Sequence, residues 1–365
     1  MTLSERIQAF SALGAYLRSA EARPELTDIA HRAHAKNNWF TPETVLKSLQ
    51  AISVEFLDAD KLAHWVSQYN LPDSLPDADR RTVGVVMAGN IPAVGFHDLL
   101  CILLSGHRVL VKLSSPDFVL IHYLIQKITE FSPILGAGIE VAERLNAADA
   151  YIATGSDNTA RYFSYYFAKK PHIIRRNRTS VAVLMGEETP AEFARLGNDL
   201  LDYYGLGCRN VSTLFVPENT DGSPYDFVPL LQTLDPRLDA FRNHHKYLNN
   251  YDYNKAILLI NGTPHFDNGF LLLTPTPGDS LVSPISVVFY RHYRDQDDLA
   301  QQLAAYSDKI QVVASAQGWY PGSVAFGQTQ QPSLTDYADG VDTMAFLASL
   351  QSQTTTTQVS LAPGS

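Results

Sequence analysis

From residue 82 onward, short apolar segments rich in β-branched residues alternate with longer helical segments, and this alternation restricts the fold more than any other feature. The predicted strands are 82–89, 108–114, 139–143, 150–155, 172–176 and 180–186, and the helices expected between them are 91–106, 116–131 and 156–170. This pattern predicts parallel strands joined by crossover helices. We therefore expect an α/β fold with a doubly wound parallel sheet, whose ligands lie beyond the carboxyl ends of the strands.

The segments before and after this part have a different character. Residues 1–78 are predicted to be helical, because apolar residues such as Ile7 and Phe10 recur at spacings of three and four. Helix-like and strand-like segments continue in the second half of the chain. The final stretch, 351–365, is polar and low in complexity, and we expect it to be disordered.

The composition limits the possible partners. Hydrophobic residues make up 45% of the chain and charged residues 18%, as is typical of a globular protein. The formal net charge of −10 argues against nucleic acid as the main partner, since phosphate binding requires a basic surface. The polar, mixed-charge start does not resemble a signal peptide, and no apolar run is long enough to predict a membrane span. We expect a cytoplasmic location.

The chain has two cysteines, too few for a disulfide framework or a cysteine-rich zinc site. Cys101 lies within an apolar helix and is predicted to be a core residue. Cys208 follows a helix predicted for 189–205 and precedes a strand, in the glycine-flanked segment "YGLGCRN". Taken alone, a cysteine there is more often a turn residue than a nucleophile.

Several polar residues follow the predicted strands. Asn90 comes after the first strand, Lys112 is near the end of the second, and Thr154 and Gly155 end the fourth. Gly155 and Ser156 open a helix, where backbone N–H groups can bind a phosphate, although such a turn is more often only a cap. A binding site at this edge of the sheet is therefore one interpretation.

Several segments of the chain, taken together, indicate a protein family more specifically than any single residue or turn does. The segments "AGNIPAVGFHDLLCILLSGHRVLVKLSSPD", "ATGSDNTA", "RNRTSVAVLMG", "DYYGLGCRNVSTLFVP" and "SPISVVFYRHY" resemble the aldehyde dehydrogenase superfamily and, within it, the LuxC-type acyl-CoA (fatty acyl) reductases. The likeness covers residues from about 80 to 348. It implies an aldehyde dehydrogenase-like fold, in which a doubly wound cofactor domain is joined to a second α/β catalytic domain.

The resemblance also implies roles for individual residues. Cys208 would be the nucleophile, and the Asn90 amide together with the Cys208 backbone N–H would form the oxyanion hole. Lys112 would contact the adenosine ribose of a nicotinamide cofactor. The cofactor site would be completed by Ser115, Thr154, Gly155 and Ser156. This chain has Leu206 where the superfamily usually has glutamine.

Two departures from the superfamily pattern bear on the reaction. Hydrolytic relatives use a glutamate to activate water, but no glutamate occurs between Glu143 and Glu187. Its absence favours acyl-CoA reduction to an aldehyde over oxidation of an aldehyde to acid. Ser115 stands where NAD-preferring relatives carry a glutamate, which favours NADPH, with NADH as the alternative.

The resemblance further implies a division of the chain and a set of partners. We expect an N-terminal helical segment (1–78) packed on a cofactor-binding domain (79–205), then a catalytic domain (206–330) and a C-terminal arm (331–350) that contacts another subunit. The expected partners are acyl-CoA or an acyl donor protein, and copies of the same chain in a homo-oligomer. The alternatives are an aldehyde dehydrogenase, an acyl-transferring protein without a hydride step, and a non-catalytic assembly partner.

Other polar residues have simpler interpretations. His244 and His245 lack a carboxylate or cysteine at metal-ligand spacing, so a surface or substrate-lining role is expected and no metal is predicted. His97 is expected to be a hydrogen-bonded helix residue. Arg175, Arg176 and Arg178 form a basic cluster that would either face a phosphate of CoA or NADPH, or be solvated or make salt bridges.

Overall fold

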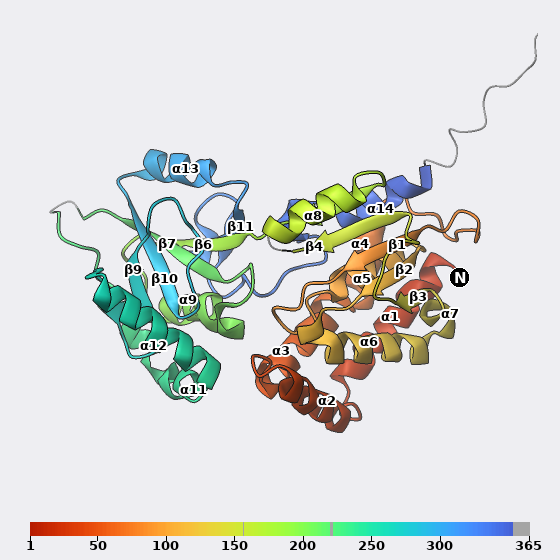
Figure 1. Ribbon diagram of the computed structural model, residues 1–365, viewed down its shortest axis with the longest axis horizontal. Helices are drawn as coiled ribbons and strands as arrows, with labels where there is room; N and C mark the ends of the chain where they lie inside the picture. Colours follow the sequence, from red (N-terminus) through yellow and green to blue (C-terminus); the bar gives the residue numbers. More distant parts are fainter. Residues whose placement is uncertain (156, 220–221, 353–365) are drawn as a thin grey trace, which may run out of the picture. The chain divides into compact units, whose positions relative to one another are not determined.

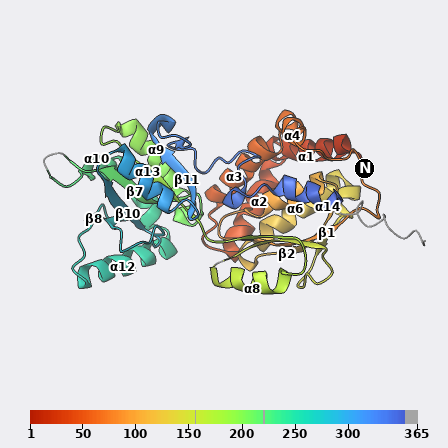
Figure 2. The ribbon, with the colours of Figure 1, turned by 90° about the horizontal axis from the view of Figure 1, so that it is seen from above.

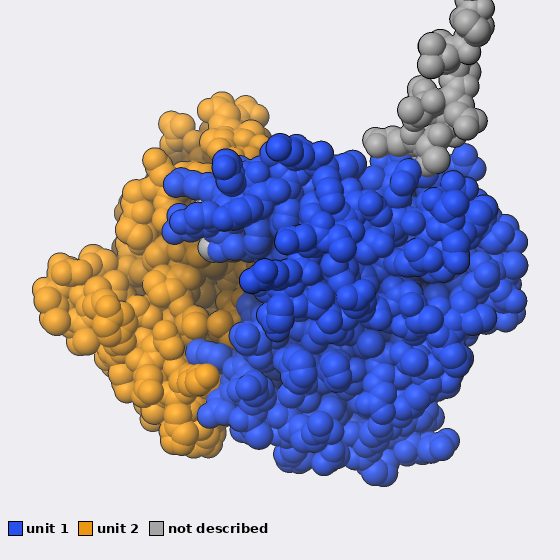
Figure 3. Space-filling model, turned by 45° about the vertical axis from the view of Figure 1, so that its right-hand side comes forward, with its two compact units in different colours: residues 1–176, 333–365 blue, residues 177–332 orange. Residues whose placement is uncertain are grey.

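The computed structural model describes residues 1–155, 157–219 and 222–352, and these form two compact units (Figure 3). Unit 1 comprises Met1–Arg176 and the chain from Ser333 onward, and unit 2 comprises Asn177–Pro332. The chain thus leaves unit 1 once, builds unit 2, and returns to complete unit 1.

The sheet of unit 1 has five strands in the order β3-β2-β1-β4-β5, and all its neighbouring pairs are parallel. The strands are β1 (Thr82–Val86), β2 (Arg108–Lys112), β3 (Ile139–Val141), β4 (Ala150–Thr154) and β5 (His172–Arg175). The chain order reverses direction at β1, which lies between β2 and β4. Such a reversal creates a crevice at the carboxyl ends of the two strands on either side of it.

Helices cover both faces of this sheet, as Figures 1 and 2 show for α6 and α8. The helices of unit 1 are α1 (Leu3–Arg18), α2 (Arg23–Lys36), α3 (Pro42–Ala51), α4 (Ala59–Val66), α5 (Phe96–Leu104), α6 (Phe118–Phe131), α7 (Pro133–Gly136), α8 (Asp157–Phe167) and α14 (Thr343–Ser352). On one face, the α5 side chains pack with the N-terminal helices in a single large core. On the other face, Tyr151 of β4 stacks on Phe167 of α8. The predicted doubly wound parallel sheet is therefore confirmed.

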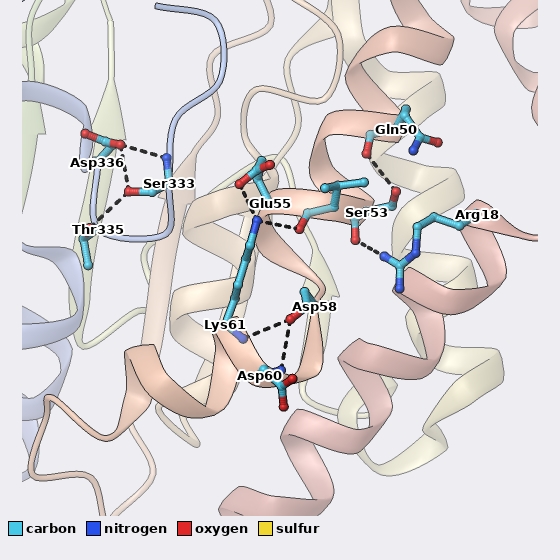
Figure 4. Close-up of polar contacts among 11 residues, drawn as sticks. Arg18, Gln50, Ser53, Glu55, Asp58, Asp60, Lys61, Ser333, Thr335 and Asp336 are labelled. Atoms are coloured by element: carbon cyan, nitrogen blue, oxygen red, sulfur yellow. Dashed lines mark hydrogen bonds and ion pairs between the residues drawn. The ribbon is translucent and has the colours of Figure 1, made fainter. Parts of the chain in front are cut away.

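Local sequence signals explain the N-terminal helices. Thr2 and Glu5 form a capping box at the start of α1, and Asp58 caps α4 by accepting hydrogen bonds from the N–H groups of Asp60 and Lys61. Lys61 also pairs with Glu55 across the short π-helical turn Ile52–Phe56 that follows α3 (Figure 4). The apolar faces of these helices join the core of unit 1, so residues 1–66 are part of that unit.

The returning chain completes the core of unit 1. Met344 and Leu347 of α14 are fully buried there. Arg175, at the end of β5, donates a 2.6 Å hydrogen bond to Asp98 and a 2.7 Å hydrogen bond to Thr343 Oγ1. These buried contacts connect β5, α5 and the C-terminal segment, which are distant in sequence.

Unit 2 contains a seven-stranded sheet in the order β12-β11-β6-β7-β10-β9-β8, parallel except for the β8–β9 pair. Its strands are β6 (Thr179–Val183), β7 (Val211–Pro217), β8 (Phe266–Asp267), β9 (Leu272–Pro275), β10 (Val287–Tyr293), β11 (Ile310–Ser315) and β12 (Val324–Ala325). Its helices are α9 (Pro190–Leu201), α10 (Val228–Leu234), α11 (Leu238–Arg242), α12 (His245–Ile260) and α13 (Gln296–Ala305). Leu299 of α13 packs with Phe215 in one cluster, and Tyr251 of α12 packs with Phe289 in another.

The observed division differs from the boundary expected between residues 205 and 206. It falls at Arg176 and Asn177, because β6 pairs with β7 and β11 of unit 2. Helix α9 follows β6 and belongs to unit 2 as well. Of the tail expected to be disordered, residues 351 and 352 end α14, and residues 353–365 lie outside the described residues.

Candidate active site

Unit 1 brings most of the predicted cofactor-binding residues to one edge of its sheet. In the register of the sheet, Val86 of β1 is opposite Lys112 of β2 on one side and Ala153 of β4 on the other. The residues after these strands therefore emerge side by side, with Asn90 following β1 and Gly155 following β4. Asn90 and Lys112 are exposed, whereas Thr154 and Gly155 are half-buried. This edge lies at the reversal point of the strand order, where ligands of such sheets bind.

Close backbone packing shapes this edge. A Cβ at Gly89 would lie 2.3 Å from Ser114 Oγ, so glycine allows the chain after β1 to approach the chain after β2. A Cβ at Gly155 would lie 3.0 Å from the Thr159 side chain, inside the first turn of α8. The Gly155 N–H donates a 3.3 Å hydrogen bond to the Arg175 carbonyl. The close packing of the chain after β1 on the chain after β2, and of the chain after β4 on α8, therefore depends on these two glycines.

The turn after β2 carries Ser115 and a buried acid. Ser115 is exposed and begins the 3-10 turn Ser115–Asp117. The carboxyl of Asp117 is buried beneath Gly89, and neither of its oxygens has a hydrogen-bond partner. Burial raises the pKa of Asp117 well above its usual value. Ser156, the remaining predicted residue, lies outside the described residues.

Cys208 lies in unit 2, on the turn between α9 and β7, and its side chain is exposed. Cys101 is fully buried, as predicted, and neither cysteine forms a disulfide. The Cys208 carbonyl accepts a 3.0 Å hydrogen bond from Ser180 Oγ, and the Asn210 N–H donates to the Gly207 carbonyl at 3.0 Å. The thiol is thus presented on a turn whose backbone is anchored to β6.

The chain reaches this turn through an unusual conformation. Helix α9 was expected to continue to Gly205, but it ends at Leu201 because Asp202 is not helical (φ −55°, ψ 141°). Tyr203, Tyr204 and Gly205 follow with φ values of 52°, 59° and 75°. The left-handed conformation costs a non-glycine residue roughly 1–2 kcal/mol. Such strain is kept where surrounding contacts over-determine the backbone, and it clusters at functional sites. This conformation is consistent with a functional role for the segment before Cys208.

A buried carboxylate fixes a neighbouring segment to the same turn. Asp199 of α9 is fully buried and accepts hydrogen bonds from the Gly327 N–H (2.6 Å), the Thr329 N–H (3.1 Å) and Thr329 Oγ1 (2.8 Å). The Thr329 carbonyl in turn accepts a 2.5 Å hydrogen bond from Nε of Arg209. Burial raises the pKa of Asp199 to about 6, against the effect of these hydrogen bonds.

The raised pKa of Asp199 gives a prediction for the pH dependence of stability. A carboxyl whose pKa is higher in the folded than in the unfolded state contributes fully below the unfolded pKa, near 4, and loses that contribution as pH rises through 6. About two pKa units correspond to a loss of about 3 kcal/mol. Urea unfolding at several pH values should therefore show a steeper fall between pH 4 and 6 in the wild type than in Asp199→Asn. Equal slopes in the two proteins would contradict the raised pKa of Asp199. Loss of hydrogen bonds alone would lower the free energy of unfolding by the same amount at every pH.

The two sets of predicted residues therefore belong to different units. The structure gathers Asn90, Lys112, Ser115, Thr154 and Gly155 in unit 1, and places Cys208 in unit 2. Sequence reasoning did not identify Asp199 or Asn210, which support the Cys208 turn. Neither residue carries a local signal of this role, since both act through contacts that only the fold creates.

The remaining polar candidates have structural roles in the described part of the chain. Nδ1 of His244 caps α12 by accepting from the Tyr247 N–H at 3.1 Å, and its ring packs on Tyr204. His97 is hydrogen-bonded to the Leu334 carbonyl, as expected of a satisfied helix residue. Arg175 makes the salt bridge that was one of its two interpretations. Among the described residues, no three His, Cys, Asp or Glu side chains form a group able to hold a metal ion.

The helices within the described ranges were also compared with the length and apolarity that a bilayer requires. None of them combines the two to the extent that a membrane-crossing segment needs.

Comparison with known proteins identifies the fold class. No family model matches the sequence, and no curated protein matches it. Solved structures do match. A Mycobacterium tuberculosis aldehyde dehydrogenase complexed with NAD+ aligns over 86% of this chain and 73% of that one, with a TM-score of 0.61 at 14% identity.

Two further structures give the same result. A Pseudomonas syringae indole-3-acetaldehyde dehydrogenase variant in complex with NAD+ aligns over 88% of this chain and 74% of that one, with a TM-score of 0.64 at 12% identity. A Streptococcus pyogenes succinic semialdehyde dehydrogenase in complex with NADP+ aligns over 86% of this chain and 76% of that one, with a TM-score of 0.60 at 10% identity. The chain therefore has the aldehyde dehydrogenase-like α/β fold predicted from its sequence.

Proposed function

We propose that the protein reduces an acyl-CoA thioester, with a fatty acyl group as the expected acyl group, to the aldehyde through an acyl-enzyme on Cys208. The observation that carries this proposal is the exposed thiol of Cys208 on an anchored turn, in a fold shared with structures solved in complex with NAD+ and NADP+. The acyl donor is acyl-CoA or an acyl donor protein, and the working protein is a homo-oligomer.

The first step is acyl transfer to sulfur. The Cys208 thiolate forms a C–S bond to the thioester carbon, and the C–S bond to CoA breaks, so that CoA leaves as a thiolate and takes a proton from solvent. The Asn90 amide and the Cys208 backbone N–H would stabilise the oxyanion of the tetrahedral intermediate. Dividing one difficult reduction at a thioester into two steps lowers each barrier.

The residues at the edge of the unit 1 sheet would hold a dinucleotide cofactor. Gly155 would let the backbone approach a pyrophosphate at the start of α8, and Lys112, which is exposed, would contact the adenosine ribose. When bound, NADPH supplies the hydride that reduces the thioester carbon. Cys208 then leaves as the thiolate, the aldehyde carbonyl forms, and the enzyme is ready for a further turnover.

Hydrolysis of the acyl-enzyme requires a base that activates water, and Asp199 is poorly suited to this role. The Asp199 carboxylate, nine residues before Cys208 in the sequence, has no exposed surface, and three hydrogen bonds occupy its oxygens. No glutamate occurs between Glu143 and Glu187. Both observations favour transfer to a thiol and to hydride over release of a carboxylic acid.

The test is a product analysis with intact-mass measurement. Acyl-CoA alone should add one acyl group to the protein, and NADPH should then remove it while aldehyde accumulates. Oxidation of an aldehyde to carboxylate with no use of CoA would instead support an aldehyde dehydrogenase. A stable acyl adduct that NADPH does not discharge would support an acyl-transferring protein.

Cofactor preference gives a second prediction. Ser115→Glu should place a carboxylate near the 2′-phosphate of NADPH, and the repulsion of about 1 kcal/mol should raise the KM for NADPH by about fivefold. The KM for NADH should change less than twofold. Ser115→Gln, which has the same size and no charge, is the matched control. Equal KM changes for both cofactors in Ser115→Glu would contradict the placement of Ser115.

A further inference from the structure

Asn210 occupies a distinctive position two residues after Cys208. Its side chain is almost fully buried, and its amide bonds to both sides of the Cys208 turn. Nδ2 donates to the carbonyl oxygens of Asp199 (3.1 Å) and Asp202 (2.8 Å), while Oδ1 accepts from the N–H of Gly207 (2.8 Å). One amide therefore joins the end of α9 to the residue before the cysteine.

The contacts of Asn210 fall where the backbone has the greatest need of support. A helix end leaves carbonyl groups without partners inside the helix, and the carbonyls of Asp199 and Asp202 are at the end of α9. The next residues, Tyr203 and Tyr204, are both left-handed, a conformation that relaxes unless other contacts hold it. The Asn210 amide closes a loop around these strained residues.

We propose that Asn210 is a positioning residue for Cys208: its side-chain amide fixes the path of residues 202–207 and so sets the direction of the Cys208 thiol and backbone N–H. This inference rests on the proposed role of Cys208 as nucleophile, and it adds a residue to which no role in the reaction had been assigned. Asn210 itself does not touch the substrate.

The chemistry of the site requires an amide. The two carbonyl oxygens need a donor and the Gly207 N–H needs an acceptor, and the asparagine side chain provides both. In Asn210→Asp, a carboxylate oxygen would face the carbonyls of Asp199 and Asp202. In Asn210→Ala, all three hydrogen bonds are lost. Both variants should let the turn relax.

The experiment compares two reactions of Cys208 with different geometric demands. Acylation by p-nitrophenyl acetate requires the thiol and the oxyanion donors to be correctly oriented relative to each other, whereas alkylation by iodoacetamide needs only an accessible thiolate. In Asn210→Ala and Asn210→Asp, we expect the acylation rate constant to fall about 10- to 100-fold, since small misplacements are costly for oriented reactions. Alkylation should change by less than about threefold, because it depends on the thiolate alone.

Tyr293→Phe is the matched control for a general loss of stability. Tyr293 ends β10 and donates a buried 2.6 Å hydrogen bond to the Leu184 carbonyl, at the opposite end of the unit 2 strands from Cys208. This variant should lose stability and keep both rate constants. If a folded Asn210 variant acylates within twofold of Tyr293→Phe, the proposal is wrong.

Two further measurements separate the possible outcomes. If p-nitrophenyl acetate acylates wild-type Cys208 but acyl-CoA does not, the proposed substrate is wrong, and the comparison of Asn210 variants still applies. If neither Asn210 variant folds, hydrogen exchange of the wild type decides. The Gly207 N–H should then exchange at least about 100-fold more slowly than an open loop amide. Unprotected exchange at Gly207 would overturn the proposal.

Discussion

Replacement of Cys208 by alanine is expected to abolish acyl transfer. The variant should form no acyl adduct with acyl-CoA and should lose aldehyde production by on the order of 10⁴-fold, because no other group in the proposed mechanism can carry the acyl chain. The exposed position of Cys208 means that the substitution removes little packing, so folding should be unaffected. Intact-mass spectra and NADPH consumption check both expectations.

Cys101→Ala is the matched control for the Cys208 variant. Cys101 is the other cysteine of the chain and is fully buried, so its removal should lower stability and leave the adduct in place. If the Cys208→Ala protein still forms the acyl adduct and the Cys101→Ala protein does not, then Cys101 of unit 1 carries the acyl group and the mechanism is refuted.

The second large effect is expected at Asn90. Removal of one oxyanion donor typically costs 10²–10³-fold in rate, so loss of the proposed donor in Asn90→Ala should slow acylation of Cys208 by a factor on the order of 10² to 10³. The effect should appear in kcat, with KM changed far less, because the oxyanion exists only in the transition state and the intermediate. Pre-steady-state mass measurements of adduct formation provide the rate.

Two observations would separate this role from a structural one. Asn146→Ala replaces another exposed asparagine of unit 1, in the loop between β3 and β4, and should leave the rate unchanged. If Asn90→Ala retains a rate within threefold of the wild type while Cys208→Ala is inactive, the oxyanion donor must be sought elsewhere.

The sequence was most informative where a signal is local. The apolar runs identified the strands of unit 1, and the capping box of Thr189 and Glu192 correctly began α9. The division between the units was not readable in this way, because β5 and β6 are similar short runs separated by three residues. Assignment of β6 to unit 2 depends on its pairing with β11, more than 100 residues later.

The same distinction applies to the candidate site. Asn90, Lys112 and Gly155 were predictable because parallel strands bring their carboxyl ends to one edge, and the register confirms that neighbourhood. The support of the Cys208 turn was not predictable. It depends on left-handed tyrosines, a side-chain type that gives no warning of such a conformation, and on the buried groups of Asp199 and Asn210.

The order in which unit 1 is assembled has a consequence for biosynthesis. Unit 2 is an insertion, so a ribosome must translate all of it before Thr343 can reach Arg175 and before Met344 and Leu347 can fill their places beside α5. Until then the nascent protein exposes an apolar surface and a cation paired only with Asp98. We expect newly made chains to need chaperone protection for longer than their first 176 residues alone would suggest, and loss of residues 343–352 to leave the same apolar surface exposed.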